Sequence, residues 1–171
     1  MTQKVTDKLL RSFIAGLLVL TSFSVLAAPS AENGLILKDT VHKVERFVDE
    51  NGEVQRRLVD VDSVIPGDEL RYTITFSNEG TAIVDAGSIV ITNKIPEAAE
   101  YIDGTAFGSG TDITFSVNGG GEYAAADDLT VQVAGAEVAA SPKDYTTIRW
   151  IFQPELAANS EGFVSFNVRL K

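Results

Sequence analysis

Apolar residues recur at every second position through most of the chain after Leu35. In the stretch LRYTITFS, residues 70–77, four apolar or aromatic side chains point one way and four polar side chains point the other. A two-residue period is typical of strands that bury one face. The Thr, Val, Ile and aromatic residues of these runs also suit a pleated, half-buried surface. The period therefore predicts a chain made of β-strands.

The same alternation returns in four later runs, at 113–117, 129–133, 148–152 and 164–170. Gly, Asn and Pro stand between the runs, and these residues adopt the backbone angles that turns require. Asn51-Gly52 lies between two runs and predicts a β-hairpin. We expect these runs to be strands of one domain.

The segment DTVHKVERFVDE has two interpretations. Val41, Val44 and Val48 have helical spacing, whereas Val41 and Phe47 share the parity of a strand. The hairpin signal that follows favours a strand. About seven to nine short strands in one domain then predict an all-β fold, an antiparallel immunoglobulin-like β-sandwich, with a closed barrel as the alternative. Trp150, the only Trp, is predicted to anchor the core.

The chain begins with a basic stretch, an uncharged apolar run (Phe13–Ala28) and then small residues. This layout predicts a cleaved signal peptide, 1–27, with the cut after Ala27. The run is shorter than the roughly 20 residues of a spanning helix, which disfavours an uncleaved anchor. The absence of Cys fits a bacterial export route. We expect a periplasmic, cell-surface or extracellular protein with a short flexible lead (28–34) and one domain (35–171).

Acidic residues outnumber basic ones by 24 to 14, which gives a formal net charge of −10. Such a surface repels nucleic acid and anionic lipid, because both bind to basic patches. We therefore expect a protein partner, with a second copy of the chain among the candidates. We expect no nucleic-acid partner and no stable membrane insertion once the signal peptide is removed.

The sequence VIPGDELRYTITFSNEGTA, with SIVITNKIPEAAEYIDGTA and the final IRWIFQPELAANSEGFVSFNVRLK, resembles a bacterial module. It is similar to the conserved repeat domain family of unknown function called DUF-eleven, over residues 64–171. The family pattern is a Pro-Gly-Asp turn, a Tyr-Thr-Ile-Thr strand, an Asn-x-Gly turn and a strand that ends in Ile-Pro. The turn LAANSEG departs from the usual family wording.

The resemblance implies an immunoglobulin-like fold on an exported protein and implies no activity. Together with the strand pattern, it marks residues with a structural role. They are Pro66, Gly67, Asp68, Tyr72, Ile74, Phe76, Asn78, Gly80, Pro96 and Trp150.

The residues that catalysis usually requires are scarce. His42 is the only His, Cys is absent and no GxSxG motif occurs, so nucleophilic sites and zinc or copper sites lack their groups. We expect no enzyme activity and no cofactor. Calcium is the one metal to consider, because it needs only clustered oxygens. The candidate ligands are Asp60, Asp62, Asp68, Glu69, Asp127 and Asp128.

Two functions remain. The leading hypothesis is an exported structural or interaction module that acts by protein–protein contact, including self-association by strand addition, because an open sandwich has unpaired edges. The segment 35–48 could supply a strand in cis, which we favour, or in trans to a neighbour. The alternative is a monomeric surface module that binds glycan or calcium through its loops. Its loop aromatic residues would be Tyr101, Phe107, Tyr123 and Tyr145.

Overall fold

The computed structural model describes residues 34–171. The predicted signal peptide and residues 28–33 of the predicted lead lie outside this part. The described strands are β1 (Leu35–Val48), β2 (Val54–Asp60), β3 (Glu69–Asn78), β4 (Ile89–Lys94), β5 (Ala99–Tyr101), β6 (Phe107–Gly108), β7 (Thr111–Ser116), β8 (Thr130–Val133), β9 (Ala136–Ala139), β10 (Thr147–Phe152) and β11 (Glu161–Leu170). Two 3₁₀ helices, η1 (Ala126–Asp128) and η2 (Pro142–Asp144), complete the elements.

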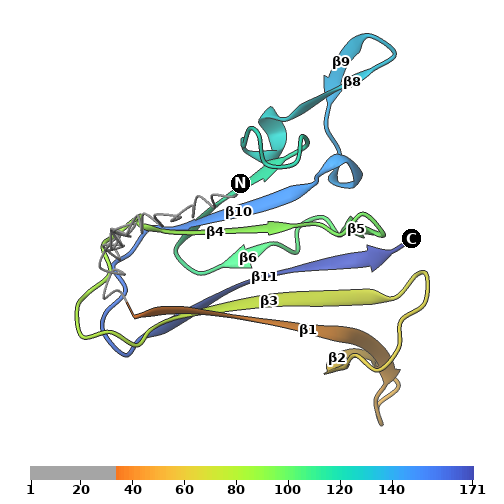
Figure 1. Cartoon of the computed structure of the whole chain (residues 1–171). Coiled ribbons are helices and arrows are strands. Elements are labelled where there is room, and N and C mark those ends of the chain that lie inside the picture. Colours follow the sequence, from red (N-terminus) through yellow and green to blue (C-terminus); the bar gives the residue numbers. More distant parts are fainter. Residues whose placement is uncertain (1–33) are drawn as a thin grey trace, which may run out of the picture. The chain divides into compact units, whose positions relative to one another are not determined.

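Two antiparallel sheets form a sandwich, which confirms the predicted all-β fold (Figure 1). The larger sheet has the order β2-β1-β3-β11-β5, and β6 also pairs with β11. The smaller sheet has the order β4-β10-β7. The described strands outnumber the expected seven to nine partly because β5 and β6 are only three and two residues long.

The core lies between β3 and β11 on one side and β10 on the other. Ile74, Phe76 and Phe166 are buried, and Trp150 is fully buried, as the parity of its strand predicts. Contacts between aromatic rings join the two sheets. The ring of Trp150 lies 5.9 Å from that of Phe166, and Phe76 meets Phe152 edge-on at 5.1 Å. The segment DTVHKVERFVDE, residues 39–50, which had two interpretations, forms the second part of the strand β1 up to Val48, and the Asn51-Gly52 hairpin follows it.

The run 129–133 does not join either sheet of the sandwich. Only Leu129 reaches the core, while β8 pairs with β9 in a separate hairpin that stands clear of the sheets (Figure 1). Its turn residues, Ala134 and Gly135, both have positive φ, at 52° and 85°. The alternation at 129–133 does correspond to a strand, but this strand lies outside the two sheets of the sandwich. A two-residue period specifies a strand but not the sheet to which it belongs.

The Pro66-Gly67-Asp68 motif forms the turn that leads into β3. The Asp68 N–H donates to the Ile65 carbonyl at 3.1 Å, and Gly67 has a φ of +92°. This backbone angle is strained for residues with a Cβ, so the turn requires glycine at this position. The motif sets where β3 starts.

Asn78 ends β3 and holds two loops together. Its side-chain amide donates to the carbonyls of Ala82 (2.8 Å) and Leu156 (3.0 Å), and its Oδ1 accepts the Gly80 N–H at 3.0 Å. Asn78 is only 1 % exposed. The Asn-x-Gly motif therefore closes one end of the sandwich through buried hydrogen bonds. Tyr72, which was also expected to have a structural role, stacks on Phe166 with ring centroids 5.0 Å apart.

Candidate interaction surface

β1 and β2 form a ribbon at one edge of the larger sheet, called here the β1–β2 ribbon. Residues 35–43 of β1 pair with β3, and residues 42–48 pair with β2. β2 has no strand partner other than β1 in the described sheets. The β1–β3 ladder is therefore the only strand pairing that joins this ribbon to the sandwich within residues 34–171.

Apart from Leu35, which is partly buried against the core, the side chains of β1 contribute little to it. Leu37 lies directly opposite Phe76 and therefore shares its face, yet Leu37 is 55 % exposed whereas Phe76 is 1 % exposed. Val41, opposite Tyr72, is 37 % exposed, and the same face of β1 also carries the exposed Asp39. The smaller sheet thus covers β3 but leaves the corresponding face of β1 open to solvent.

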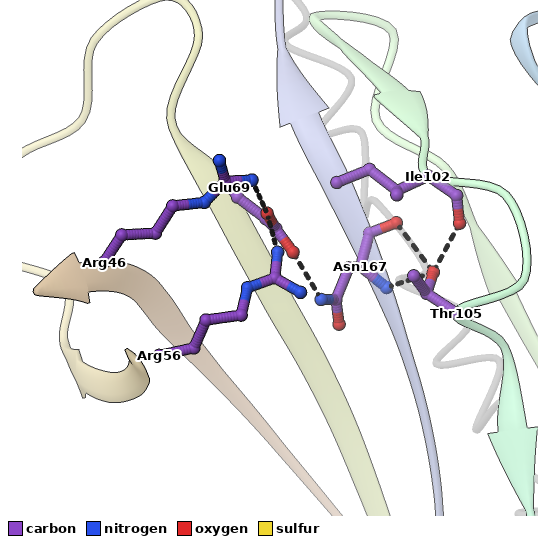
Figure 2. A network of polar contacts seen from close by, with 6 residues as sticks. All are labelled: Arg46, Arg56, Glu69, Ile102, Thr105 and Asn167. Carbon is purple, nitrogen blue, oxygen red and sulfur yellow. Dashed lines mark hydrogen bonds and ion pairs between the residues drawn. The ribbon is translucent and has the colours of Figure 1, made fainter. Parts of the chain in front are cut away.

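A buried carboxylate attaches the far end of the ribbon to the sheet. Glu69 at the start of β3 is 6 % exposed and accepts hydrogen bonds from Arg56 of β2 and from the Asn167 side chain of β11, the latter at 2.7 Å (Figure 2). Arg46 of β1 lies 3.9 Å from the same carboxylate. We call Arg46, Arg56, Glu69 and Asn167 the Glu69 clasp.

The clasp continues into the loop after β5. The Thr105 hydroxyl accepts the backbone N–H of Asn167 at 3.0 Å and donates to the Ile102 carbonyl (Figure 2). The clasp therefore connects β1, β2, β3, β11 and this loop. Buried charges are normally paired, so these contacts hold the ribbon in one position against the sheet.

A second ion pair joins the ribbon to the Pro-Gly-Asp turn. Lys43 Nζ of β1 lies 2.7 Å from Asp68 Oδ2, and the Ile65 N–H also donates to this carboxylate, at 2.9 Å. The hydrogen bond from Lys43 and then that from Ile65 hold the pKa of Asp68 below its usual value. The carboxylate form of Asp68 is therefore favoured in the folded protein.

Substituting Asp68→Asn is expected to make the stability fall less steeply as the pH is lowered into the acid range. A carboxyl whose pKa is lowered by folding stabilises the protein above its unfolded pKa of about 3.9, and this contribution is lost as the pH falls through the folded pKa. The wild-type melting temperature should fall over this window more steeply than that of the variant. Asp62→Asn, an exposed change in the same connection, should keep the wild-type slope. Equal slopes for wild type and Asp68→Asn would contradict the assignment.

The calcium candidates do not form one cluster. Within residues 34–171, no three His, Cys, Asp or Glu side chains are placed to hold a metal ion. Asp68 and Glu69 bind cationic side chains instead. Asp60 lies 3.9 Å from His42 Nε2, Asp62 is exposed, and Asp127 and Asp128 belong to η1. Acids close in sequence separate here because strand residues alternate between faces and the turn redirects the chain.

The loop aromatic residues named for the alternative function do not lie in one common setting. Tyr101 and Tyr145 are buried against Phe115, with ring centroids 5.4 and 4.6 Å from it. Tyr123 lies beneath Arg149, whose guanidinium carbon is 4.0 Å from the ring centroid. Phe107, by contrast, is half-exposed. These four aromatic residues therefore offer no common open platform for a sugar ring.

His42 is less solvated than a surface histidine. Its side chain is 33 % exposed, and its Nδ1 is buried without a hydrogen-bond partner in the described part of the chain. It lies opposite Arg71 on β3 and Asp60 on β2. In the described part of the chain His42 is thus flanked by the neighbouring strands β2 and β3.

The Glu69 clasp was not predicted from sequence. Glu69 was singled out only as a calcium candidate, and Arg46, Arg56 and Asn167 were not singled out at all. Their only sequence signal is that Arg46 and Arg56 lie almost symmetrically about Asn51-Gly52, which makes them cross-strand neighbours in a hairpin. No local pattern connects them to Asn167, which is 98 residues from Glu69.

Comparisons with known proteins found no matching family model, no matching curated protein and no matching solved structure. The resemblance to the DUF-eleven family therefore rests on the sequence motifs alone and stays a prediction. Among residues 34–171, no helix is long and apolar enough to cross a membrane.

Proposed function

We propose that this chain is an exported, non-catalytic structural module that acts by protein–protein contact, and that copies associate by exchanging β1. One observation carries the proposal. β1 is bound to β3 through a nine-residue ladder, residues 35–43, while its inward side chains, led by Leu37, stay largely exposed. Such a strand contributes main-chain hydrogen bonds to the sheet edge and little to the core.

Exchange preserves the contacts that the single chain makes. If β1 of one copy pairs with β3 of another, the same ladder forms between two chains, which is the low-cost route of domain swapping. Residues 61–64 of the connection from β2 to β3 are exposed and are where the chain would change direction. Gly67 and Asp68, which follow, stay hydrogen-bonded to Leu170 of β11. Strand addition at a sheet edge is also a common mode of peptide recognition.

The open face of β1 supports assembly further. Leu37 and Val41 share this face and are exposed, and Ile36, on the opposite face of the same strand, is exposed as well. Exposed apolar surface next to a sheet edge is typical of interaction sites. Export is proposed from the signal-peptide layout of residues 1–27, and the acidic charge of −10 supports a protein partner over nucleic acid.

Disulfide trapping can distinguish exchange from pairing within one chain. The sequence contains no Cys, so introduced cysteines have no competitors. Lys38 and Thr75 lie directly opposite each other on β1 and β3, and opposed residues of an antiparallel pair are within disulfide range. A Lys38→Cys variant with an affinity tag would be mixed with an untagged Thr75→Cys variant, refolded together and oxidised. Exchange predicts a disulfide-linked heterodimer.

The matched control places its two cysteines on two neighbouring strands of the larger sheet, β3 and β11. Thr75 on β3 lies opposite Phe163 on β11, and this ladder forms within one chain. Mixing Thr75→Cys with tagged Phe163→Cys should therefore give only the background of random dimers. The exchange of β1 would be overturned if the mixture of Lys38→Cys and Thr75→Cys gave no more heterodimer than this background. A chain that carries both cysteines would then form its disulfide within the monomer at every concentration.

A further inference from the structure

A cavity of about 400 Å³ lies at the end of the sandwich where β4 ends and β10 begins. Residues from four separate parts of the chain line it: the end of β4, the loop after β7, the segment from η2 to β10, and the residue after β11. Sites for small molecules in proteins have volumes in this range. The cavity is separate from the β1–β2 ribbon and the Glu69 clasp.

The cavity is cationic although the protein is acidic. Lys94, Lys143 and Lys171 line it, and none of them takes part in an ion pair within residues 34–171. Lys171 Nζ donates only to the carbonyl of Glu97, at 3.0 Å. Glu97 is the one acidic residue of the lining. Three ammonium groups against one carboxylate favour an anionic ligand.

The remaining wall is apolar. Ile95 and Tyr145 line the cavity, and both are more than nine-tenths buried. We infer that this cavity binds a small organic carboxylate. The lysine ammonium groups pair with the carboxylate, and the body of the molecule packs against Ile95 and Tyr145. This binding is independent of β1 exchange.

Calorimetric titration of the protein tests the inference with two probes. Sodium glucuronate carries its carboxylate on a hydroxylated ring, and sodium benzoate carries it on an apolar ring. Saturable one-site binding of either probe is expected. The probe that binds more tightly shows whether the cavity prefers a hydroxylated or an apolar ring beside the carboxylate. Lys94→Gln and Lys143→Gln should each weaken binding roughly tenfold, which is the effect of losing one charged contact.

Two controls separate a site from general charge effects. Lys38→Gln removes an exposed lysine of β1, outside the cavity lining, and should leave the affinity unchanged. Glucose, which is neutral, should not compete. The inference would be overturned if neither carboxylate gave a saturable signal up to about 10 mM. It would equally be overturned if Lys38→Gln and Lys94→Gln reduced the affinity by the same factor.

Discussion

Replacing Trp150 with alanine is expected to lower the free energy of unfolding by about 3–5 kcal/mol. The side chain is fully buried and lies opposite Ile91 and Ile113 on the two neighbouring strands. β10 is the central strand of the smaller sheet, so the substitution opens a cavity where the two sheets meet. Urea denaturation followed by circular dichroism measures the loss without relying on tryptophan fluorescence.

Trp150→Phe is the matched control. The indole N–H of Trp150 has no hydrogen-bond partner within the described residues, so phenylalanine loses volume but breaks no hydrogen bond. Its cost should be less than half that of alanine, because most of the ring contact with Phe166 survives. An alanine variant within about 1 kcal/mol of the wild type would refute the role of Trp150 as the core anchor.

Replacing Asn78 with leucine is expected to cost about 2–4 kcal/mol, the sum of three buried hydrogen bonds at roughly 1 kcal/mol each plus the groups left unpaired. Leucine has a similar size, so the effect reports the lost polar contacts and not a cavity. The Gly80 N–H and the carbonyl of Ala82 lose their Asn78 partner. The midpoint of urea denaturation should fall with little change in the slope of the transition.

Asn78→Asp separates the donor from the acceptor role of this side chain. The carboxyl keeps the acceptor for the Gly80 N–H but loses both donors and faces two carbonyl oxygens. Burial beside these oxygens should raise the pKa of the introduced carboxyl. Its destabilisation is then greatest above the raised pKa and shrinks as the pH falls towards about 4. The leucine variant should show a pH-independent deficit, and a pH-independent aspartate variant would contradict this account.

The strands with a strict alternation were predictable because their apolar face determines which side of the strand is buried. In β3 mainly one parity is buried between the sheets, so the period of the sequence and the burial of the structure agree. In β11 all of residues 164–168 are buried, although only the even-numbered ones are apolar. β8 has the same period but is low in large apolar residues and mostly exposed. Its alternation could not reveal whether a second sheet would cover it.

The candidate sites were less predictable because they depend on pairs far apart in sequence. The Glu69 clasp and the lysine-lined cavity bring together residues from several elements, and only the folded sheet register places them. The acids of the Asp60–Glu69 stretch illustrate the reverse case. They are close in sequence, but the turn at Gly67 directs them to different cations.

The β8–β9 hairpin makes this protein a natural carrier for a displayed epitope. Its tip, Ala134-Gly135, is exposed, and its strands pair only with each other. A peptide grafted at this tip would lengthen an appendage and leave every ladder of the sandwich unchanged. Because the sequence has no cysteine, a single Cys in the graft would also give one defined attachment point for a dye or a surface. The element that adds least to the core is thus the one most open to engineering.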